Sequence, residues 1–306
     1  YTTLFRSSII DVPEYTIVFP AAAEGDTWFA IGDDKACDAI ANNEEGAWKL
    51  LYGTTSGNGL NGESGTLTRR TNLSDDGSFK VEAGAKYISV TIDMKAMTYR
   101  IKAVNFSQYI YEAGVNNGWG SIEQPLYSAD MDGKYIGFFY AQEDSWTDGK
   151  GAFKFTGSFN SWDNGNYGTG TMNDDGLSGT LIDDGESGNI MPAPGFYRAE
   201  VNLANMTYQL TPINGIGIIG PAQAGGWGED TDMTYNKETR AWEATIELAA
   251  DEFKFRANDD WAINWGGAVD NLTQDGSNLK IGEAGTYFIQ FFPLCETKSY
   301  CTITKQ

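Results

Sequence analysis

Three segments of this chain share one pattern, a glycine turn followed by a strand that opens near a tyrosine. A second strand of alternating polar and apolar residues follows each segment and carries another tyrosine. Two such strands joined by a short turn predict a β-hairpin. The three pairs of tyrosines are Tyr87 with Tyr99, Tyr197 with Tyr208, and Tyr287 with Tyr300. Because a repeated hairpin indicates repeated modules, we expect an all-β chain of three tandem Ig-like β-sandwich modules.

Each module is expected to end after its closing hairpin. This places the modules at residues 1–104, 105–212 and 213–306. Each is about 100 residues long, the usual size of an Ig-like sandwich. The 37 glycines and the 13% of aromatic residues suit short strands joined by tight turns. No apolar run approaches the ~20 residues that a membrane helix needs.

The net charge and the missing histidine narrow the functions that the chain can have. A net charge of −21 repels a polyanion such as DNA, so no nucleic-acid partner is expected. Without histidine the chain has no Ser-His-Asp or Cys-His arrangement. Its three cysteines are too few for a four-cysteine zinc site, and we expect no metal and no cofactor. Paired carboxylates remain available, because 42 residues are acidic.

Two smaller features leave alternatives open. Cys295 and Cys301 flank a predicted hairpin tip, where they form either a cross-strand disulfide or two half-buried thiols, and Cys37 stays unpaired. Two acidic loops, Asp174-Asp175-Gly176 and Asp183-Asp184-Gly185, are candidate calcium loops by composition, although they lack EF-hand spacing. Turn formation explains both loops equally well.

The third module has three tryptophans in or near glycine-rich loops. Sugar rings stack their apolar faces on aromatic side chains, while their hydroxyls bond to Lys, Arg, Asn and Asp. A tryptophan in such a loop is expected to be partly exposed, as a sugar platform must be. Core packing is the alternative, because aromatic side chains also fill the ends of small sandwiches. The candidate residues of this site are Trp227, Lys254, Arg256, Asn258, Trp261 and Trp265, and the core alternative is strongest for Trp265.

Lys254 lies between two phenylalanines of a predicted strand. Side chains alternate along a strand, so Phe253 and Phe255 are expected to face the core. Lys254 and Arg256 then share the outward face, where a charged group can meet a sugar hydroxyl.

The second module has a matching set of candidates and the first does not. In the second module, Thr156 stands where the third has Arg256, so its site is expected to be weaker or tuned to another sugar arrangement. An inserted loop brings Trp146 as a further contact. The first module has Trp28 and Trp48 but no Phe-Lys-Phe strand, and we expect it to be structural. The candidates of the second module are Trp119, Lys154, Asn160, Trp162 and Tyr167.

The ordered motifs of the third module resemble the SusE/SusF family of starch-binding outer-membrane lipoproteins. The resemblance is strongest over Gly215–Gln306, moderate in the second module and limited to the closing hairpin in the first. It rests on Gly225-Gly226-Trp227, Phe253-Lys254-Phe255-Arg256, the segment from Trp261 to Gly267, and Gly285-Thr286-Tyr287.

The resemblance implies starch-binding-type β-sandwich modules that bind starch or another α-glucan without cutting it. In the family, two aromatics and a Lys or Arg grip the glucan. By position these would be Trp227, Lys254 and Trp261 or Trp265. The resemblance also implies a lipid-anchored protein on the cell outer membrane, partnered by a SusC/SusD-like, TonB-dependent uptake complex.

Three alternatives remain at this stage. The polysaccharide is xylan, mannan or pectin instead of starch; the chain is a glycosidase; or it is a purely structural or adhesive Ig-like surface protein. No acidic pair recurs beside the aromatic candidates, which disfavours the glycosidase. Because the chain begins at Tyr1, we expect a fragment whose leader and lipid anchor lie outside it, so that membrane contact comes only through that anchor.

Overall fold

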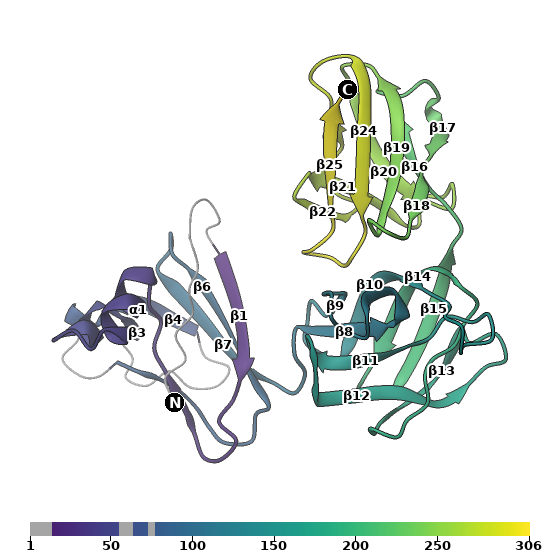
Figure 1. Ribbon diagram of the computed structural model, residues 1–306. Coiled ribbons are helices and arrows are strands. Elements are labelled where there is room, and N and C mark those ends of the chain that lie inside the picture. Colours follow the sequence, from purple (N-terminus) through teal and green to yellow (C-terminus); the bar gives the residue numbers. More distant parts are fainter. Residues whose placement is uncertain (1–13, 55–63, 73–76) are drawn as a thin grey trace. The chain divides into compact units, whose positions relative to one another are not determined.

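The computed structural model describes residues 14–54, 64–72 and 77–306 and divides the chain into two compact units, Tyr1–Ser107 and Gln108–Gln306 (Figure 1). Both units are built mainly of antiparallel β-strands in several sheets. The expectation of a mainly β chain with several modules is confirmed in this form. The division into three modules ending near residues 104 and 212 stays a prediction.

The N-terminal unit has one larger sheet and one short ribbon within its described residues. The ribbon packs on the sheet through an aromatic core in which Phe29 stacks on Phe79, and Phe79 meets the ring edge of Tyr99. The sheet has the order β1 (Glu14–Pro20), β6 (Tyr87–Asp93), β7 (Thr98–Val104), β4 (Ser64–Arg69), β3 (Tyr52–Thr54), and the ribbon pairs β2 (Thr27–Phe29) with β5 (Phe79–Val81).

A short helical segment separates β2 from β3 in this unit. Helix α1 (Asp34–Ala41) begins after Asp33, whose carboxylate accepts a hydrogen bond from the Ala36 amide at 2.9 Å. This is an N-cap, which satisfies a free amide at the helix start. Two 3₁₀ turns follow in the chain, at Ala47–Leu50 and Arg70–Asn72.

The first part of the second unit is a closed β-barrel, which we call the barrel module. Its closure depends on the short strand β9, which pairs with both β8 and β10. The strand order is β10 (Lys134–Ala141), β14 (Gly195–Asn202), β15 (Thr207–Ile213), β13 (Ser178–Asp183), β12 (Ser161–Met172), β11 (Phe153–Ser158), β8 (Tyr109–Gly114), β9 (Pro125–Tyr127). A 3₁₀ turn, Val115–Asn117, follows β8.

The barrel differs from the expected sandwich of this module. The described residues therefore do not show three Ig-like sandwiches. A sandwich leaves its edge strands unpaired, whereas pairing of β9 with both neighbours removes the open edge. Sequence periodicity specifies which face of a strand is buried but not whether the end strands of a sheet meet.

The second part of this unit, which we call the C-terminal module, consists of two sheets around one core. Phe255 of one sheet stacks on Phe291 of the other, with ring centroids 4.3 Å apart. One sheet has β17 (Gly226–Asp232), β16 (Ile216–Gly220), β20 (Glu252–Ala257), β21 (Asn264–Ala268), β22 (Asn271–Gln274), with β23 (Leu279–Lys280) also pairing β20; the other has β18 (Thr234–Asn236), β19 (Ala241–Leu248), β24 (Gly285–Phe292), β25 (Tyr300–Lys305).

The three closing hairpins are confirmed as the antiparallel pairs β6–β7, β14–β15 and β24–β25. Two of the repeated tyrosines also make the same bond. The hydroxyl of Tyr197 donates to the carbonyl of Ala193, and that of Tyr287 donates to the carbonyl of Glu283. In both cases the tyrosine ties the start of its strand to the preceding turn.

The barrel module and the C-terminal module share a hydrophobic core. Phe138 of β10 lies edge-on against Trp265, and Phe196 of β14 lies edge-on against Trp242. The amide of Phe138 donates to the carbonyl of Leu294 at 2.7 Å. These contacts hold the two modules together as one compact unit.

Candidate functional site

Two tryptophans of the C-terminal module form an exposed pair. Trp227 lies at the start of edge strand β17, and Trp261 lies in the loop after β20. Each is 44% exposed, and their ring centroids are 6.0 Å apart with a tilt of 45°. The structure thus brings together two of the predicted platform residues and leaves both rings open to solvent.

A buried glutamine holds the loop that carries Trp227. The Gln223 amide nitrogen donates to the carbonyls of Gly226 and Glu229 at 2.9 and 2.7 Å. Its side-chain oxygen accepts from the Gly225 amide and the Thr231 hydroxyl. These partners lie in the turn before Trp227 and in β17 after it, so the side chain holds the backbone on both sides of the indole. Sequence reasoning missed this role, because a loop glutamine carries no signal of its own.

An ion pair between Arg256 and Asp230 lies against the Trp261 ring. The guanidinium of Arg256 lies 5.0 Å from the Trp261 ring centroid and binds both carboxylate oxygens of Asp230. The Asp230 side chain is almost fully buried. Gly217 leaves the necessary space, because a Cβ there would lie 2.6 Å from the Asp230 Cβ. The Arg256 guanidinium therefore contacts the Trp261 indole and Asp230. It is less exposed to solvent than expected for a residue on the outward face of the strand.

Lys254 is half-buried between the fully buried Phe253 and Phe255, so the predicted alternation of this strand is confirmed. Burial lowers the pKa of Lys254, and the charge of Asp275 opposes that effect. Lys254 and Trp227 belong to the same sheet, with β16 between their strands.

Two further candidates serve the fold. Trp265 is 3% exposed and packs edge-on against Phe138 and Phe291, each about 5 Å away by centroid. It is a core residue, and the prediction of a surface role is wrong for it. The Asn258 side chain accepts from the Asn214 amide and donates to the Pro212 carbonyl, so it ties the Trp261 loop to the segment that enters β16.

The barrel module also has a pair of indoles, but from a different combination of loops. Trp119 follows the turn after β8, and its ring stacks on Trp146 with centroids 6.2 Å apart and a tilt of 27°. Trp146 is exposed and belongs to the inserted loop, where the buried Thr147 hydroxyl donates to the Asp144 carbonyl. The insertion thus supplies the partner of Trp119.

The other candidates of the barrel module are spread along β11 and β12. Lys154 is buried, and burial lowers its pKa against the opposing charges of Glu186 and Asp184. Asn160 occupies the hairpin turn between the strands in a left-handed conformation. Trp162 is exposed at the start of β12, and the half-buried Tyr167 ring lies against Gly165. The ring contact that the structure provides for Trp119 is with Trp146.

The N-terminal unit carries two exposed indoles. Trp48 is 50% exposed on the 3₁₀ turn Ala47–Leu50. Trp28 of β2 is 45% exposed, and the ammonium of Lys80 lies 5.8 Å from its ring. Lys80 in turn forms an ion pair with Asp26 at 2.8 Å.

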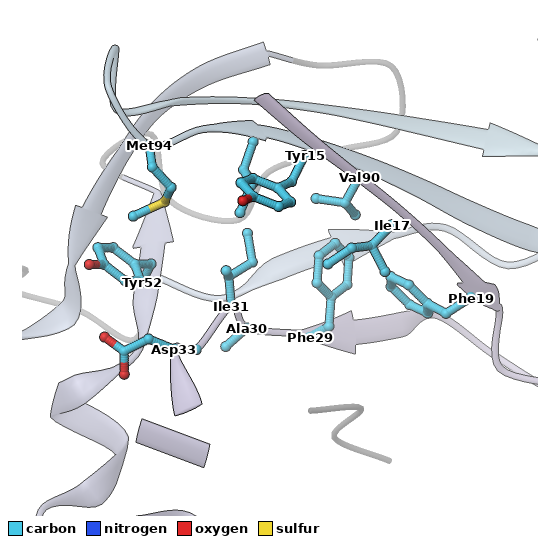
Figure 2. A pocket seen from close by; sticks show the side chains of 12 residues that line it. Tyr15, Ile17, Phe19, Phe29, Ala30, Ile31, Asp33, Tyr52, Val90 and Met94 are labelled. Carbon is cyan, nitrogen blue, oxygen red and sulfur yellow. The ribbon is translucent and has the colours of Figure 1, made fainter. Parts of the chain in front are cut away.

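The same unit contains a small apolar cavity, shown in Figure 2. Its volume is about 50 Å³, far below the ~300–1,000 Å³ of ligand pockets. Asp33 lines it, but the Asp33 carboxylate caps α1 and pairs with Arg69 at 2.6 Å. The cavity is therefore too small and too apolar to hold a sugar.

A larger hollow of about 820 Å³ lies between the barrel module and the C-terminal module. Its walls include Tyr127 and Arg198 on the barrel side, and Ile263 and Asp275 next to the Trp261 loop. Many of its charged groups are already used: Lys134 pairs with Asp132 at 2.9 Å, and Asp275 accepts from Asn264 at 2.7 Å.

The open questions about cysteine and calcium are narrowed by the structure. All three cysteines are buried, Cys295 and Cys301 are not joined by a disulfide, and burial raises the pKa of both to about 12. In the part of the chain that the structure describes, no three His, Cys, Asp or Glu side chains are arranged to hold a metal ion. Asp175 and Asp184 instead accept amide hydrogens within their own turns. Among the described residues, no helix has the length and apolar character to cross a membrane.

The fold and the indole pairs define a class of β-module proteins that present aromatic platforms on their surface. Residues 3–103 match the family model described as SusF, first starch-specific CBM, a carbohydrate-binding module. The resemblance to the SusE/SusF family is confirmed, but the match lies in the N-terminal module, whereas the sequence motifs placed it most strongly in Gly215–Gln306.

The solved structures include one with 16% identity, the crystal structure of SusF from Bacteroides thetaiotaomicron. That comparison covers 96% of this chain and 67% of the other, with a TM-score of 0.39. The comparison with curated proteins found no match.

Proposed function

We propose that this chain is a non-catalytic glycan-binding protein that captures starch or a related α-glucan. The observation that carries the proposal is the exposed, tilted pair of Trp227 and Trp261, which has a counterpart in the stacked Trp119 and Trp146. Burying the apolar faces of two sugar rings on two indoles supplies affinity without any chemical step.

The tilt of the C-terminal pair favours a curved glycan over a flat one. Two rings inclined by 45° cannot both lie flat against a straight, ribbon-like chain. A helical α-glucan turns successive sugar faces toward a common side, so that each indole can meet one face. The family description of the N-terminal module, with its starch-specific CBM, points to the same ligand class.

The glycan-binding candidates in this proposal are Trp227, Trp261 and Lys254 in one module, and Trp119, Trp146 and Lys154 in the other. Arg256 supports Trp261 from below. The finer parts of the proposal are a lipid anchor on the outer-membrane surface and a SusC/SusD-like, TonB-dependent uptake partner. They rest on the family resemblance.

A catalytic role is disfavoured by the carboxylates beside the indoles. A glycosidase needs two carboxyl groups about 5 Å or about 6.5–9.5 Å apart across an open cleft. Near Trp261, Asp260 accepts from the Ala262 amide within its own loop, and Asp230 is buried against Arg256.

The proposal predicts retardation of the intact chain in native gels that contain starch. The panel includes xylan, mannan and pectin gels, and bovine serum albumin serves as a control for charge and sieving. Retardation only in a gel that contains xylan, mannan or pectin would indicate that this polysaccharide, and not starch, is the ligand. Free migration on every gel would favour a structural or adhesive surface protein, and release of reducing sugar by the pure protein would contradict a non-catalytic role.

The N-terminal unit is a third candidate binding surface, in contrast to the structural role that its sequence suggested. In the C-terminal module, the Trp261 loop connects the bridged residues Phe255 and Trp265. In the N-terminal unit, the segment with Trp48 connects the bridged residues Ile31 and Tyr52. Trp48 therefore stands in the segment that corresponds to the Trp261 loop.

We expect Trp48→Ala to abolish the starch retardation that remains after both indole pairs of the second unit are replaced by alanine. Trp28→Ala is the matched control, because Trp28 is similarly exposed but lies on a different segment. The measurement is affinity electrophoresis in the quadruple-alanine background. No retardation in that background before Trp48 is changed would support the structural role of the unit.

A further inference from the structure

The loop that carries Trp119 rests on a carboxyl group with no access to solvent. Glu112 of β8 is 0% exposed and lies two residues before the end of its strand. We propose that Glu112 and Asn117 are positioning residues for Trp119, and that the barrel-module site is held by the protonated Glu112 and released when this group loses its proton. The inference rests on the proposed function, because it concerns one of the two indole pairs.

Asn117 is the direct link between Glu112 and the loop. Its side-chain nitrogen donates to the Glu112 carboxyl and to the Glu112 carbonyl, both at 2.9 Å. Its side-chain oxygen accepts from the amides of Gly114 and Gly120 at 3.0 and 2.9 Å. The two glycines flank the turn that contains Trp119, so this buried amide closes the loop around the indole.

Trp119 has a backbone conformation that needs such support. Its φ is +58°, in the left-handed region that residues with a side chain rarely adopt. The Trp119 amide donates to the Gly114 carbonyl at 2.8 Å. Since the loop holds a strained residue, loss of the Asn117 bonds is expected to let the indole move away from Trp146.

The surroundings of Glu112 favour its neutral form. Burial raises the pKa of Glu112 to about 8, while the hydrogen bond from Asn116 and the charge of Arg240 oppose this. One carboxyl oxygen accepts from Asn117, and the other, in the described chain, has no hydrogen-bond partner. That oxygen lies against Gly114, where a Cβ would be only 2.3 Å away. An ionised carboxylate would be poorly solvated in this position.

Among the described residues, the charged and titratable groups of neighbouring elements form no ion pair with the Glu112 carboxyl. Arg240, from the turn before β19, donates its own hydrogen bond to Gln124. Tyr235 of β18 is half-buried, and desolvation raises its pKa, so it stays neutral. On β11, Lys154 pairs in register with Ala113, and the acidic groups that act on it are Glu186 and Asp184.

The C-terminal module has no ionisable group in the corresponding place. Glu112 pairs in register with Phe155, and the residue that pairs with the corresponding Phe255 is Ile218. There the Trp227 loop is held by the neutral Gln223. The two sites are therefore expected to differ in their response to pH because, of the Trp119 and Trp227 loops, the Trp119 loop rests on an ionisable side chain and the Trp227 loop on a neutral one.

The direction of the effect follows from proton linkage. An acid with a higher pKa in the folded chain binds more protons when folded than when unfolded. For Glu112 this holds between its ordinary value of 4.5 and about 8. The contribution of its protonated form to stability is complete below the lower value and is lost as the pH rises through about 8.

The first test follows the indole signals of the intact chain by NMR across a pH titration. The Trp119 signal, assigned with a Trp119→Phe variant, is expected to shift with a midpoint near pH 8, while the Trp227 signal stays constant. Glu112→Gln keeps an acceptor for Asn117 and should abolish the shift. Glu112→Leu removes that acceptor and should displace the Trp119 signal at every pH.

The second test measures binding of maltoheptaose by calorimetry in two variants of the intact chain. One carries Trp227→Ala, Trp261→Ala and Trp48→Ala, and so retains only the barrel pair. At about pH 9.5 only ~3% of Glu112 stays protonated, so the apparent affinity should weaken by up to roughly 30-fold relative to about pH 6.5. Glu112→Gln should remove this loss. The reciprocal variant, which retains only the C-terminal pair, should lose much less affinity, and its loss measures what Lys254 and general effects of pH contribute.

Each outcome decides one of the two proposals. A Trp119 signal that stays constant, or that shifts equally in Glu112→Gln, overturns the inference. Equal loss of binding in both variants at high pH also overturns it, because a general effect of pH would then suffice. If neither variant binds at about pH 6.5, glycan binding by these two indole pairs is contradicted, while the indole titration still decides the role of Glu112.

Discussion

Replacing both Trp227 and Trp261 by alanine is expected to weaken binding of a long α-glucan by roughly 30- to 700-fold, which corresponds to about 2–4 kcal/mol. Both rings are open to solvent in the free protein, so a sugar can cover them without rearrangement of the loops. Isothermal titration calorimetry with an oligosaccharide long enough to contact both rings measures the effect. The fold should not change, because two exposed side chains contribute little to stability.

The matched control is Trp162→Ala in the barrel module. Trp162 is also an exposed tryptophan near a turn, but the ring contact of Trp119 is with Trp146. Trp162→Ala is expected to change the affinity for glycan much less than replacement of both Trp227 and Trp261. Equal losses in both variants would indicate that any exposed indole suffices, and that the paired geometry has no special role.

Trp265→Ala is expected to destabilise the second unit by about 3–5 kcal/mol, as removal of a buried aromatic side chain does. Its ring contacts Phe138 of the barrel module and Phe291 of the opposite sheet. The alanine would therefore leave a cavity where the two modules meet. Chemical denaturation followed by tryptophan fluorescence measures the loss, and Trp265→Phe, which keeps an aromatic ring, should lose much less.

Trp261→Ala provides the comparison for this prediction. The two tryptophans are four residues apart, yet one is buried and the other exposed. We expect Trp261→Ala to lower the affinity for glycan with little change in the free energy of unfolding. Trp265→Ala should lower the free energy of unfolding with little change in affinity, when binding is measured without denaturant at a temperature where the variant stays folded. A Trp265→Ala chain with normal stability and lost glycan binding would restore Trp265 to the binding surface.

The strands and the faces that they bury could be predicted from the sequence, but the way in which the sheets close could not. Alternation places Phe253 and Phe255 inward with Lys254 between them, and the repeated tyrosines mark the closing hairpins. Both follow from local periodicity, which the fold preserves. Closure of the barrel depends on the three-residue strand β9 and on pairs such as β10 with β14, whose strands are distant in the sequence. Local patterns contain no record of such distant pairs.

In the candidate site, too, local sequence patterns predicted some features and missed those that depend on contacts in space. Glycine-rich loops pointed to Trp227 and Trp261, whose rings are exposed and paired. The same reasoning failed for Trp265, because its neighbours in space come from β10 and β24. The buried supports of the loops, Gln223 and Asn117, had no signature in sequence, since most of their partners are backbone groups of nearby residues.

The N-terminal unit shows how short sequence motifs can miss a similarity in strand pairing. The bridged pair Ile31 and Tyr52 corresponds to Phe255 and Trp265, but a helical segment separates the first pair. The helical segment lengthens the spacing on which a motif depends. The family match to residues 3–103 lies where the short motifs are weakest.

The core shared by the barrel module and the C-terminal module has a consequence for ligands that reach both indole pairs. A flexible linker would let the second site sample many positions, and its effective concentration would fall with linker length. Here Phe138 and Phe196 pack into the neighbouring module and fix the two surfaces during folding. If both pairs bind glycan as proposed, a chain bound at one pair meets the other at a constant separation, and the second unit is expected to select chains by the distance between the sugar faces that they present.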